Sequence, residues 1–495
     1  MASLQASPLP LLQQLPLTPS KWQPAVISSH ATNGALTLDC ATAAACCGAM
    51  HAVRDVHSLT IARSPSGAAE RRARPSEEAL PAATVHELVS TLHVVATIPA
   101  LRSVELDVSD SGFQGIVDVL APALSRLSRL VDLRLGLNWF EAAGAAALAP
   151  PLGALTALTG LDLSFNRLGA AGIEALAPAL SRLSRLAHLC LVKNDVRDTG
   201  AAALAQPLSA LTALTALDVQ SNGFGVAGAE ALAPALRRLS RLAKLYLTDN
   251  EICFCGAMPL AQPLGALTTL TALRVTRCGI DPPGAEALAP ALSRLTRLAD
   301  LDLSLNFISY SRAAALAQPL AALTALTALN LGFNRLGAAG VEALAPAMTR
   351  LTRLARLYLP DNDFGAAAAA ALAQPLAALT ALTALCLCCN AICAAGAEAL
   401  APALGRLSRL ETLRLSVNCL GAAGAAALAQ PLGNLAALTL LDLQHNECSD
   451  AGVADLTPAL ARLTHLRELC VVRGNGLSPE AQAQVKDRFG PCLCE

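Results

Sequence analysis

Four cysteines lie close together at Cys386, Cys388, Cys389 and Cys393, and the first two fall on the same face of an expected strand. Thiolates are the ligands that soft metal ions prefer. A structural zinc site, however, needs four convergent ligands in a closed geometry, with cysteines usually paired as C-x₂₋₄-C. The C-x-C-C spacing matches no such pattern. We therefore predict no metal site and no cofactor.

Residue patterns typical of catalysis are missing from the sequence. There is no G-x-x-x-x-G-K-[ST] phosphate loop, which excludes a nucleotide-binding module of the immune-sensor type. No Ser/His/Asp arrangement and no pair of catalytic carboxylates can be assigned. We predict that the protein is not an enzyme and has no catalytic residues.

The composition excludes several other classes of protein. The 495 residues are 54% hydrophobic, 15% charged and 3% aromatic, which is too apolar for a disordered chain. The formal net charge of −1 lacks the basic excess of a nucleic-acid binder. Residues 313–334 and 364–397 carry no charge, but each is interrupted by Gln-Pro and by an Asn that recurs in register. We expect no nucleic-acid partner and no membrane span.

The sixteen cysteines are scattered through a chain that is long enough to bury a core without disulfides. Residues 1–19 have no basic region of a secretory signal. We therefore expect reduced thiols and a cytoplasmic location. Residues 1–38 contain no Asp or Glu, loosely like a transit peptide, so an organelle is one alternative and the cytoskeleton or axoneme is another. Residues 1–35 are predicted to form a flexible tail.

One asparagine recurs every 28 residues along most of the chain. It occupies positions 138, 166, 194, 222, 250, 306, 334, 362, 390, 418 and 446, and Cys278 fills the one gap. Each repeat reads L-x-x-L-x-L-x-x-N-x-L-G-x-x-G-A-x-A-L-A-P-A-L. Leu161 and Leu163 alternate with polar residues, which is strand periodicity. Leu176, Leu180 and Leu183 follow at helical spacing. Each repeat is therefore predicted to be a short strand, a turn and a helix.

The invariant positions suggest structural roles. We expect the Asn amide to bond the backbone of the loop that leaves the strand, and Cys278 to do part of this as a weak donor. The Gly six residues after Asn, such as Gly172, is predicted to allow a sharp turn into the helix. A proline lies inside most helices, for example Pro178, and proline removes an interior hydrogen bond. We expect short, bent or broken helices whose affected carbonyls face water.

The L-x-x-L-x-L-x-x-N-x-L and G-A-x-x-L elements resemble the ribonuclease-inhibitor-like class of leucine-rich repeat. This resemblance implies an α/β solenoid, or horseshoe, with a parallel concave sheet and convex helices. It covers residues 101–475, about 13 to 14 repeats, between a capping region at 36–100 and a C-terminal cap and tail at 476–495. The class includes enzyme inhibitors, immune sensors and activators of a small GTPase, so it implies no single function.

The residue four before each Asn varies in charge, size and shape, whereas the rest of the repeat hardly changes. Variable polar and aromatic side chains on a rigid sheet are what a protein-recognition surface needs. We predict a partner-binding concave face centred on Tyr246, Arg274, Asp302 and Tyr358. The full predicted set is Asp162, His188, Asp218, Lys244, Tyr246, Arg274, Asp302, Asn330, Arg356, Tyr358, Arg414 and Asp442. The alternative is an exposed face whose residues drift because nothing constrains them.

Arginine pairs recur every 56 residues at the helix ends, from Arg126/Arg129 to Arg406/Arg409. Such a stripe suits an acidic partner or an RNA backbone. The interpretation we favour is that these charges keep an apolar convex surface soluble and discourage slippage between near-identical repeats.

The leading hypothesis is a monomeric, non-enzymatic repeat protein that binds a protein partner on its concave face. The first alternative is a ubiquitin-ligase substrate receptor, because residues 36–62 faintly resemble the end of an F-box. The second is a protein similar to the Ran GTPase activator, although the long acidic tail of that family is not matched by residues 478–495.

Overall fold

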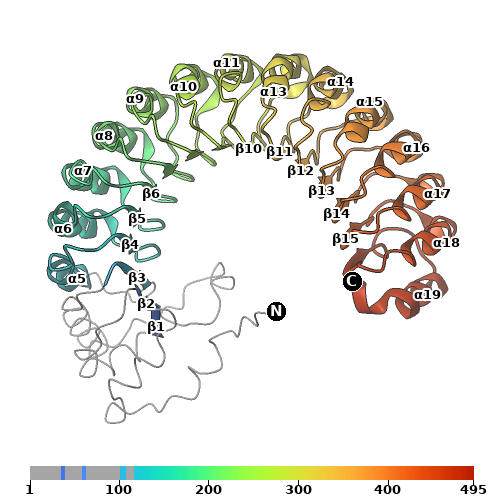
Figure 1. Ribbon diagram of the computed structural model, residues 1–495, viewed down its shortest axis with the longest axis horizontal. Helices are drawn as coiled ribbons and strands as arrows, with labels where there is room; N and C mark the ends of the chain where they lie inside the picture. Colours follow the sequence, from blue (N-terminus) through green and yellow to red (C-terminus); the bar gives the residue numbers. More distant parts are fainter. Residues whose placement is uncertain (1–34, 40–57, 63–100, 108–115, 495) are drawn as a thin grey trace, which may run out of the picture. The chain divides into compact units, whose positions relative to one another are not determined.

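The structure is a computed structural model that describes residues 35–39, 58–62, 101–107 and 116–494. It divides into two compact units, Met1–Gly223 and Phe224–Glu495. Each unit is described below by itself. Within each unit the strands form one layer and the helices a second layer behind it (Figure 1).

The first unit has strands that pair in parallel and in chain order. They are β1 (Ala35–Asp39), β2 (Ser58–Ala62), β3 (Ser103–Asp107), β4 (Asp132–Arg134), β5 (Gly160–Asp162), β6 (His188–Cys190) and β7 (Ala216–Asp218). The helices are α5 (Ile116–Leu124), α6 (Glu141–Ala154), α7 (Gly169–Leu180) and α8 (Arg197–Ala210).

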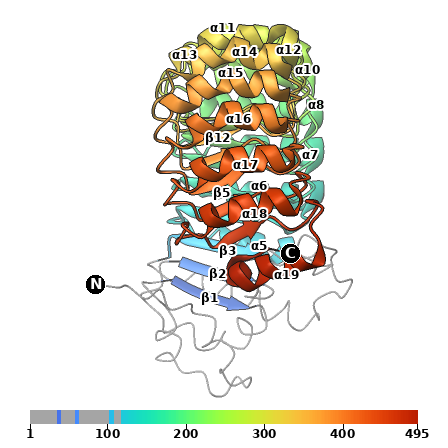
Figure 2. The same ribbon diagram turned by 90° about the vertical axis from the view of Figure 1, so that its right-hand side faces the viewer.

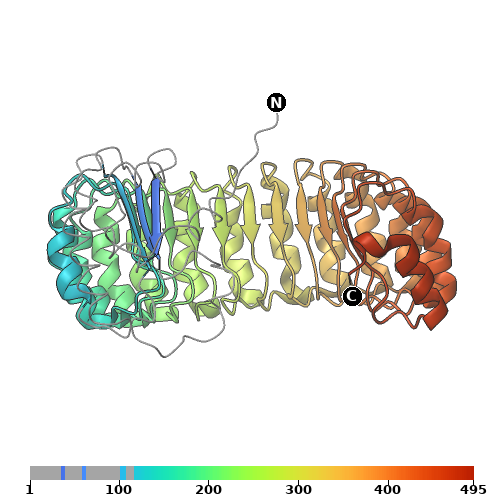
Figure 3. The same cartoon turned by 90° about the horizontal axis from the view of Figure 1, so that it is seen from below.

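The second unit continues the same alternation, and its strands lie side by side in a single layer (Figure 3). They are β8 (Lys244–Tyr246), β9 (Ala272–Arg274), β10 (Asp300–Asp302), β11 (Ala328–Asn330), β12 (Arg356–Tyr358), β13 (Ala384–Cys386), β14 (Thr412–Arg414), β15 (Leu440–Asp442) and β16 (Glu468–Cys470), all parallel.

The helices of the second unit stack in chain order, as α15 to α18 show in Figure 2. They are α9 (Val226–Leu236), α10 (Cys253–Ala266), α11 (Pro282–Leu292), α12 (Ser309–Arg312), η3 (Ala313–Leu316), α13 (Ala317–Ala322), α14 (Gly337–Met348), α15 (Gly365–Ala378), α16 (Cys393–Leu404), α17 (Gly421–Leu432), α18 (Ser449–Leu460), α19 (Pro479–Phe489) and η4 (Gly490–Cys492). After η4, the Cys494 N–H donates to the Leu469 carbonyl at 2.9 Å, so the last residues cover the edge of β16.

The predicted α/β repeat solenoid with 28-residue periodicity is confirmed in both units. Each short strand buries its middle leucine and turns the residues on either side outward, as in the exposed–buried–intermediate pattern of β12. Helix leucines such as Leu176 and Leu180 meet these strand leucines in the core.

The N-terminal predictions fall mostly on residues that the structure does not describe. Residues 1–34 lie outside the described ranges, and of the F-box-like segment 36–62 only β1 and β2 lie within them. Strand β1 pairs in parallel with β2, and β2 pairs in parallel with β3, so strand pairing begins before residue 101. The predicted domain boundaries at 35 and 100 stay predictions.

The predicted bonds of the recurring asparagine to the loop backbone are confirmed, and they form a ladder between repeats. The side-chain oxygen of Asn166 accepts from the backbone N–H of Asn138 at 3.0 Å, and its amide donates to the carbonyl of Leu135 at 2.7 Å. The recurring asparagines are buried. Asn194 and Asn362 are joined to the preceding repeat in the same way. Cys278 takes the donor role in its repeat, with its thiol 3.2 Å from the Leu247 carbonyl.

The predicted role of the conserved glycine is wrong. Gly172 lies inside α7 rather than at a sharp turn, and a Cβ added there would lie 3.2 Å from the Cβ of Ala145 in α6. The glycine therefore allows adjacent helices to pack closely. The left-handed backbone that favours glycine lies three residues earlier, at Gly169, where φ is 60°.

The helices of most repeats are short, as predicted, with 11 to 14 residues, but their prolines do not break them. Helix α7 is continuous through Pro178, and both Pro178 and Glu174, whose carbonyl loses its partner, are exposed. Water can therefore satisfy that carbonyl without breaking the helix. The interrupted helix is the one at 309–322, and Pro319 lies in its last segment, α13, rather than at the interruption.

Within the described residues, no helix is both long enough and apolar enough to cross a bilayer.

Candidate protein-binding surface

The sheet face that points away from the helices is called the open face here, and it corresponds to the predicted concave face. In the second unit the third residues of successive strands are register partners, so they form one row. This row is Tyr246, Arg274, Asp302, Asn330, Tyr358, Cys386, Arg414, Asp442 and Cys470. Lys244 and Arg356 lie in the parallel row formed by the first residues of the strands.

The structure thus brings nine of the twelve predicted site residues together on one sheet. The remaining three, Asp162, His188 and Asp218, lie in the first unit, where Asp162 and Asp218 are the register partners of Cys190 in the strand between them. The predicted binding role of all twelve stays a prediction.

The central residues of the row in the second unit are held by polar contacts. The Arg274 guanidinium lies 5.0 Å from the centre of the Tyr246 ring and 3.3 Å from a carboxylate oxygen of Asp300. The amide of Asn330 donates to Asp302 at 3.2 Å and to the Ser304 hydroxyl at 3.1 Å. These contacts hold Arg274 and Asn330 in one orientation on the open face.

The aspartates of this row have a local role that the sequence did not reveal. Asp162, Asp302 and Asp442 each accept a hydrogen bond from the backbone N–H two residues later, at 2.8, 3.0 and 3.1 Å. Such bonds shape the loop after the strand. Arginine has no acceptor atom, and the tyrosine hydroxyl lies too far from its own backbone, so Tyr246, Arg274 and Tyr358 do not shape their loops in this way.

A second surface, absent from the predictions, lies on the loops between strand and helix in the second unit. Leu305, Phe307 and Phe333 expose 44%, 54% and 44% of their areas there. They line an open hollow of about 500 Å³ together with charged side chains, and we call this the loop surface. Its charged members are Arg277, Arg335, Asp361 and Asp363. The Arg335 guanidinium lies 5.7 Å from the Phe307 ring centre.

The backbone explains why these loop side chains are exposed. Leu305 and Phe333 precede the ladder asparagines, and their φ values of 55° and 59° place them in the left-handed region. Bulky residues rarely adopt this conformation. Here it is imposed by bonds between repeats, since the Phe333 N–H donates to the Pro360 carbonyl at 2.7 Å. The signal in the sequence was an aromatic residue beside Asn where a solvated loop is normally polar.

The structure also shows how the four clustered cysteines are arranged. The Cys386 thiol donates to the sulfur of Cys388 at 3.5 Å, while Cys389 and Cys393 are exposed. Burial, together with the nearby Asp162 carboxylate, raises the pKa of Cys190 in the first unit to about 12. Within the described residues, no three His, Cys, Asp or Glu side chains are grouped so that they could hold a metal ion.

The arginine pairs lie exposed in the turns between helix and strand, and one member of several pairs packs over the preceding helix. A Cβ added at Gly265 of α10 would lie 3.5 Å from the Cδ of Arg294, and at Gly153 of α6 it would lie 3.6 Å from that of Arg182. The aliphatic stem therefore covers a small residue while the charge reaches water. This packing supports the structural interpretation of the stripe.

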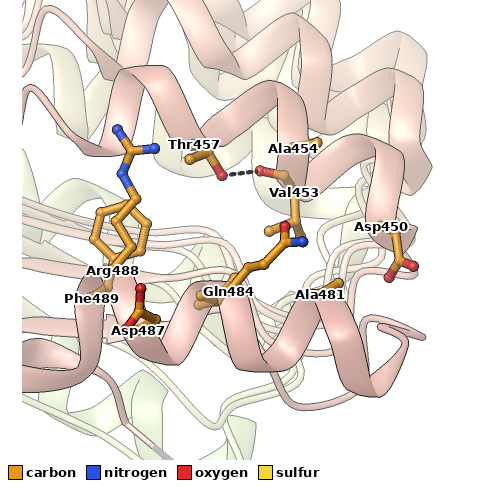
Figure 4. A pocket seen from close by; sticks show the side chains of 10 residues that line it. Asp450, Val453, Ala454, Thr457, Ala481, Gln484, Asp487, Arg488 and Phe489 are labelled. Carbon is orange, nitrogen blue, oxygen red and sulfur yellow. Dashed lines mark hydrogen bonds between the residues drawn. The ribbon is translucent and has the colours of Figure 1, made fainter.

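Another hollow, of about 350 Å³, lies between α18 and α19 (Figure 4). Two of its polar groups have hydrogen-bond partners: Thr457 donates to the Val453 carbonyl at 2.8 Å, and Asp450 accepts from the Ser478 N–H at 2.8 Å. Hydrogen bonds from Ser478 lower the pKa of Asp450. Gln484, Asp487 and Arg488 also line the hollow, beside the small side chains of Ala454 and Ala481.

A sequence profile described as Leucine Rich repeat matches residues 155–177, 210–233, 266–289, 322–345 and 408–429. The segment 266–289 contains β9 and most of α11, which is one strand and its following helix. No curated protein matches the chain.

Several solved structures are similar to the chain at low identity. An internalin (InlF) from Listeria monocytogenes is 22% identical over 64% of this chain and 81% of its own, with a TM-score of 0.44. The LRR ectodomain of the Arabidopsis receptor kinase HAESA, in complex with an extended IDA peptide hormone, is 16% identical over 77% and 72%, with a TM-score of 0.39. TLR13 in its complex with ssRNA13 is 17% identical over 90% and 65%, with a TM-score of 0.43.

Proposed function

We propose that this chain, which is a leucine-rich repeat protein, is a non-enzymatic scaffold that binds a protein partner on the open face of its second unit. The centre of the site is Tyr246, Arg274, Asp302 and Tyr358. Asp162, His188 and Asp218 of the first unit, together with Lys244, Asn330, Arg356, Arg414 and Asp442, complete the proposed set. We also propose that the protein is a monomer and that it is located in the cytoplasm.

The observation that carries the proposal is the row of register partners in the second unit. It places two half-buried tyrosines and an exposed arginine on one face, spaced by whole strands. Neighbouring strands are about 4.8 Å apart, so Tyr246 and Tyr358, four strands apart, are separated by roughly 19 Å. That span suits an interface core with aromatic and arginine anchors, the residues most enriched among binding hot spots.

The test is an affinity capture from a cell extract with the full chain and with the variant Tyr246→Ala/Arg274→Ala/Tyr358→Ala. Asp302 is left unchanged because it holds Ser304 and Asn330 in place. A control with the same charge change, Thr296→Ala/Arg353→Ala/Ser408→Ala, alters three exposed residues near the helix-to-strand turns. Far-UV circular dichroism verifies that both variants are folded.

We expect a partner that the intact chain and the control both retain and that the site variant loses. Loss of two or three anchors at 1–3 kcal/mol each weakens binding roughly 100-fold or more. A partner retained by the site variant but lost by Phe307→Ser/Phe333→Ser would move the site to the loop surface and contradict the proposal.

A further inference from the structure

Two thiols of the second unit form a pair on the open face. Cys386 is the last residue of β13, and its thiol donates to the sulfur of Cys388 at 3.5 Å. The Ser416 hydroxyl, one repeat further along, donates to the same sulfur at 3.1 Å. Two donors aimed at one sulfur favour its thiolate form. Both cysteines are partly exposed, so small solutes can reach them.

The charges around the pair act in both directions. Arg414 is the register partner of Cys386 on β14, and it favours an anion there, whereas Asp442 on β15 opposes an anion at Cys388. The hydrogen bond from Cys386 has the largest effect and lowers the pKa of Cys388 from 9.0 to about 7, against the effect of burial. The same bond raises the pKa of Cys386. One sulfur is therefore a nucleophile at neutral pH and the other keeps its proton.

Other cysteines at the same position of the repeat differ from this pair. Cys190 in the first unit is followed two residues later by Val192 rather than by a cysteine, and burial raises its pKa to about 12. Cys470 in the second unit has the Cys494 thiol beside it, but burial, together with the hydrogen bond to Cys494, raises the pKa of Cys470 to about 12. The reactive arrangement thus depends on a cysteine at position 388, where the neighbouring repeats carry Pro360 and Ser416.

We propose that Cys386 and Cys388 form a modification site, a dithiol that a hydroperoxide oxidises to an intramolecular disulfide. The Cys388 thiolate attacks the distal peroxide oxygen, the O–O bond breaks, and the alkoxide or hydroxide leaves, so that Cys388 becomes a sulfenic acid. The Cys386 sulfur then attacks the sulfur of Cys388. A disulfide forms, and the sulfenic oxygen departs as water with the Cys386 proton.

The disulfide requires a local bend of the backbone between the two cysteines. Two residues along an extended chain place Cα atoms about 6.6 Å apart at ~3.3 Å per residue. Their parallel side chains leave the Cβ atoms about as far apart, whereas a disulfide holds its Cβ atoms about 3.8 Å apart. The Cys388 carbonyl is held by the Asp361 N–H at 2.9 Å and by the Asn390 amide at 3.0 Å. The reaction therefore combines side-chain rotation with a local backbone movement at a point where these hydrogen bonds hold the chain.

The test uses the full chain with Cys389→Ser/Cys393→Ser, which leaves two cysteines in the tryptic peptide 357–406. The reduced protein is treated with hydrogen peroxide, free thiols are blocked with iodoacetamide, and the peptide mass is measured. We expect a peptide that is 2 Da lighter than its reduced form and carries no label. The amount of this peptide should increase with the concentration of peroxide. Adding Cys386→Ser should leave a sulfenic acid, which dimedone traps, and adding Cys388→Ser should leave an unoxidised peptide.

A second measurement examines the nucleophile without relying on disulfide formation. With iodoacetamide alone at pH 7, Cys388 should react roughly 100-fold faster than Cys190, because the larger thiolate fraction of Cys388 outweighs the lower intrinsic nucleophilicity of its thiolate. Trypsin releases Cys190 in the separate peptide 186–193, so the two rates can be compared. Ser416→Ala should move the half-point of the pH profile of Cys388 above pH 7. Equal labelling of Cys388 and Cys190, or a peptide that keeps both thiols in peroxide while Cys388 is alkylated normally, would overturn the proposal.

Discussion

The Asn362 side chain forms the ladder hydrogen bonds between two repeats of the second unit, and its truncation tests how the repeats are joined. The side chain is completely buried. Its oxygen accepts from the N–H groups of Asn334 and Leu336, at 3.1 and 3.3 Å. Its amide donates to the carbonyls of Leu331, Leu359 and Pro360, at 2.9, 3.2 and 3.2 Å. Asn362→Ala therefore leaves two backbone donors and up to three acceptors without this partner.

The two orphaned N–H groups decide the magnitude. A buried donor without a partner costs about 1–3 kcal/mol, whereas a carbonyl can keep a second donor. The Pro360 carbonyl does so, because it also accepts from the Phe333 N–H. We expect Asn362→Ala to lower the local free energy of unfolding by about 3–5 kcal/mol. Hydrogen exchange of the amides at 331–337 should then accelerate roughly 100-fold or more, since 1.4 kcal/mol is about tenfold.

The chain contains a natural counterpart to this variant. Cys278 replaces the ladder asparagine and keeps only weak bonds from its thiol, to the carbonyls of Leu247 and Thr276 at 3.2 and 3.4 Å. Asn362→Cys should therefore cost less than Asn362→Ala. The reverse change, Cys278→Asn, should stabilise its repeat by about 1 kcal/mol, because an amide replaces a weak sulfur donor.

Mass spectrometry of hydrogen exchange, on peptides from both regions, measures all three variants. Exchange changed less than about fivefold at 331–337 in Asn362→Ala, which is about 1 kcal/mol, would refute the reasoning. An acceleration spread evenly along the second unit would refute its local character.

Two further changes test the close packing and the left-handed positions. Gly396→Ala would place a Cβ 2.7 Å from the Cγ2 of Ile392 and 2.9 Å from the Cβ of Ala369, so it should destabilise the protein by about 1–3 kcal/mol and lower the midpoint of thermal unfolding measured by circular dichroism. An unchanged midpoint would show that α15 and α16 can separate at no cost. Cys393→Gly should stabilise by about 1 kcal/mol, because Cys393 has a φ of 57° where the next repeat toward the N-terminus has Gly365. A lower urea midpoint for this variant would contradict it.

The repeat, the strands and the ladder could be predicted because they depend on spacing alone. A polar residue recurring every 28 positions at the end of a leucine-rich strand needs buried partners from its neighbours, and Asn166 has them. The role of Gly172 and the continuity of α7 could not be predicted in this way. They depend on the distance between adjacent helices and on which carbonyls water reaches, and the 28-residue spacing specifies neither of them.

The open-face row was predictable for the same reason as the ladder, since equal spacing makes register partners of Tyr246 and Arg274. The contacts within the row were not, because Asp302 could equally have faced a partner or its own loop. The Cys386–Cys388 pair illustrates the same limit. The sequence showed two thiols on one face, but it did not show that the Ser416 hydroxyl of the next repeat is a second donor to Cys388.

The loop surface differs from the core in what its side chains contribute to folding. Phe307 and Phe333 are exposed, so they add little to the burial that stabilises the repeats. Phe333 also holds a left-handed backbone, which costs a bulky residue about 1–2 kcal/mol. The bonds between repeats supply that backbone whatever the side chain, as the Phe333 N–H shows by donating to Pro360. A chain with a polar residue or glycine at this position would therefore fold as well. The aromatic rings contribute to the exposed surface and not to folding, and a partner bound on the open face would also contact these loops.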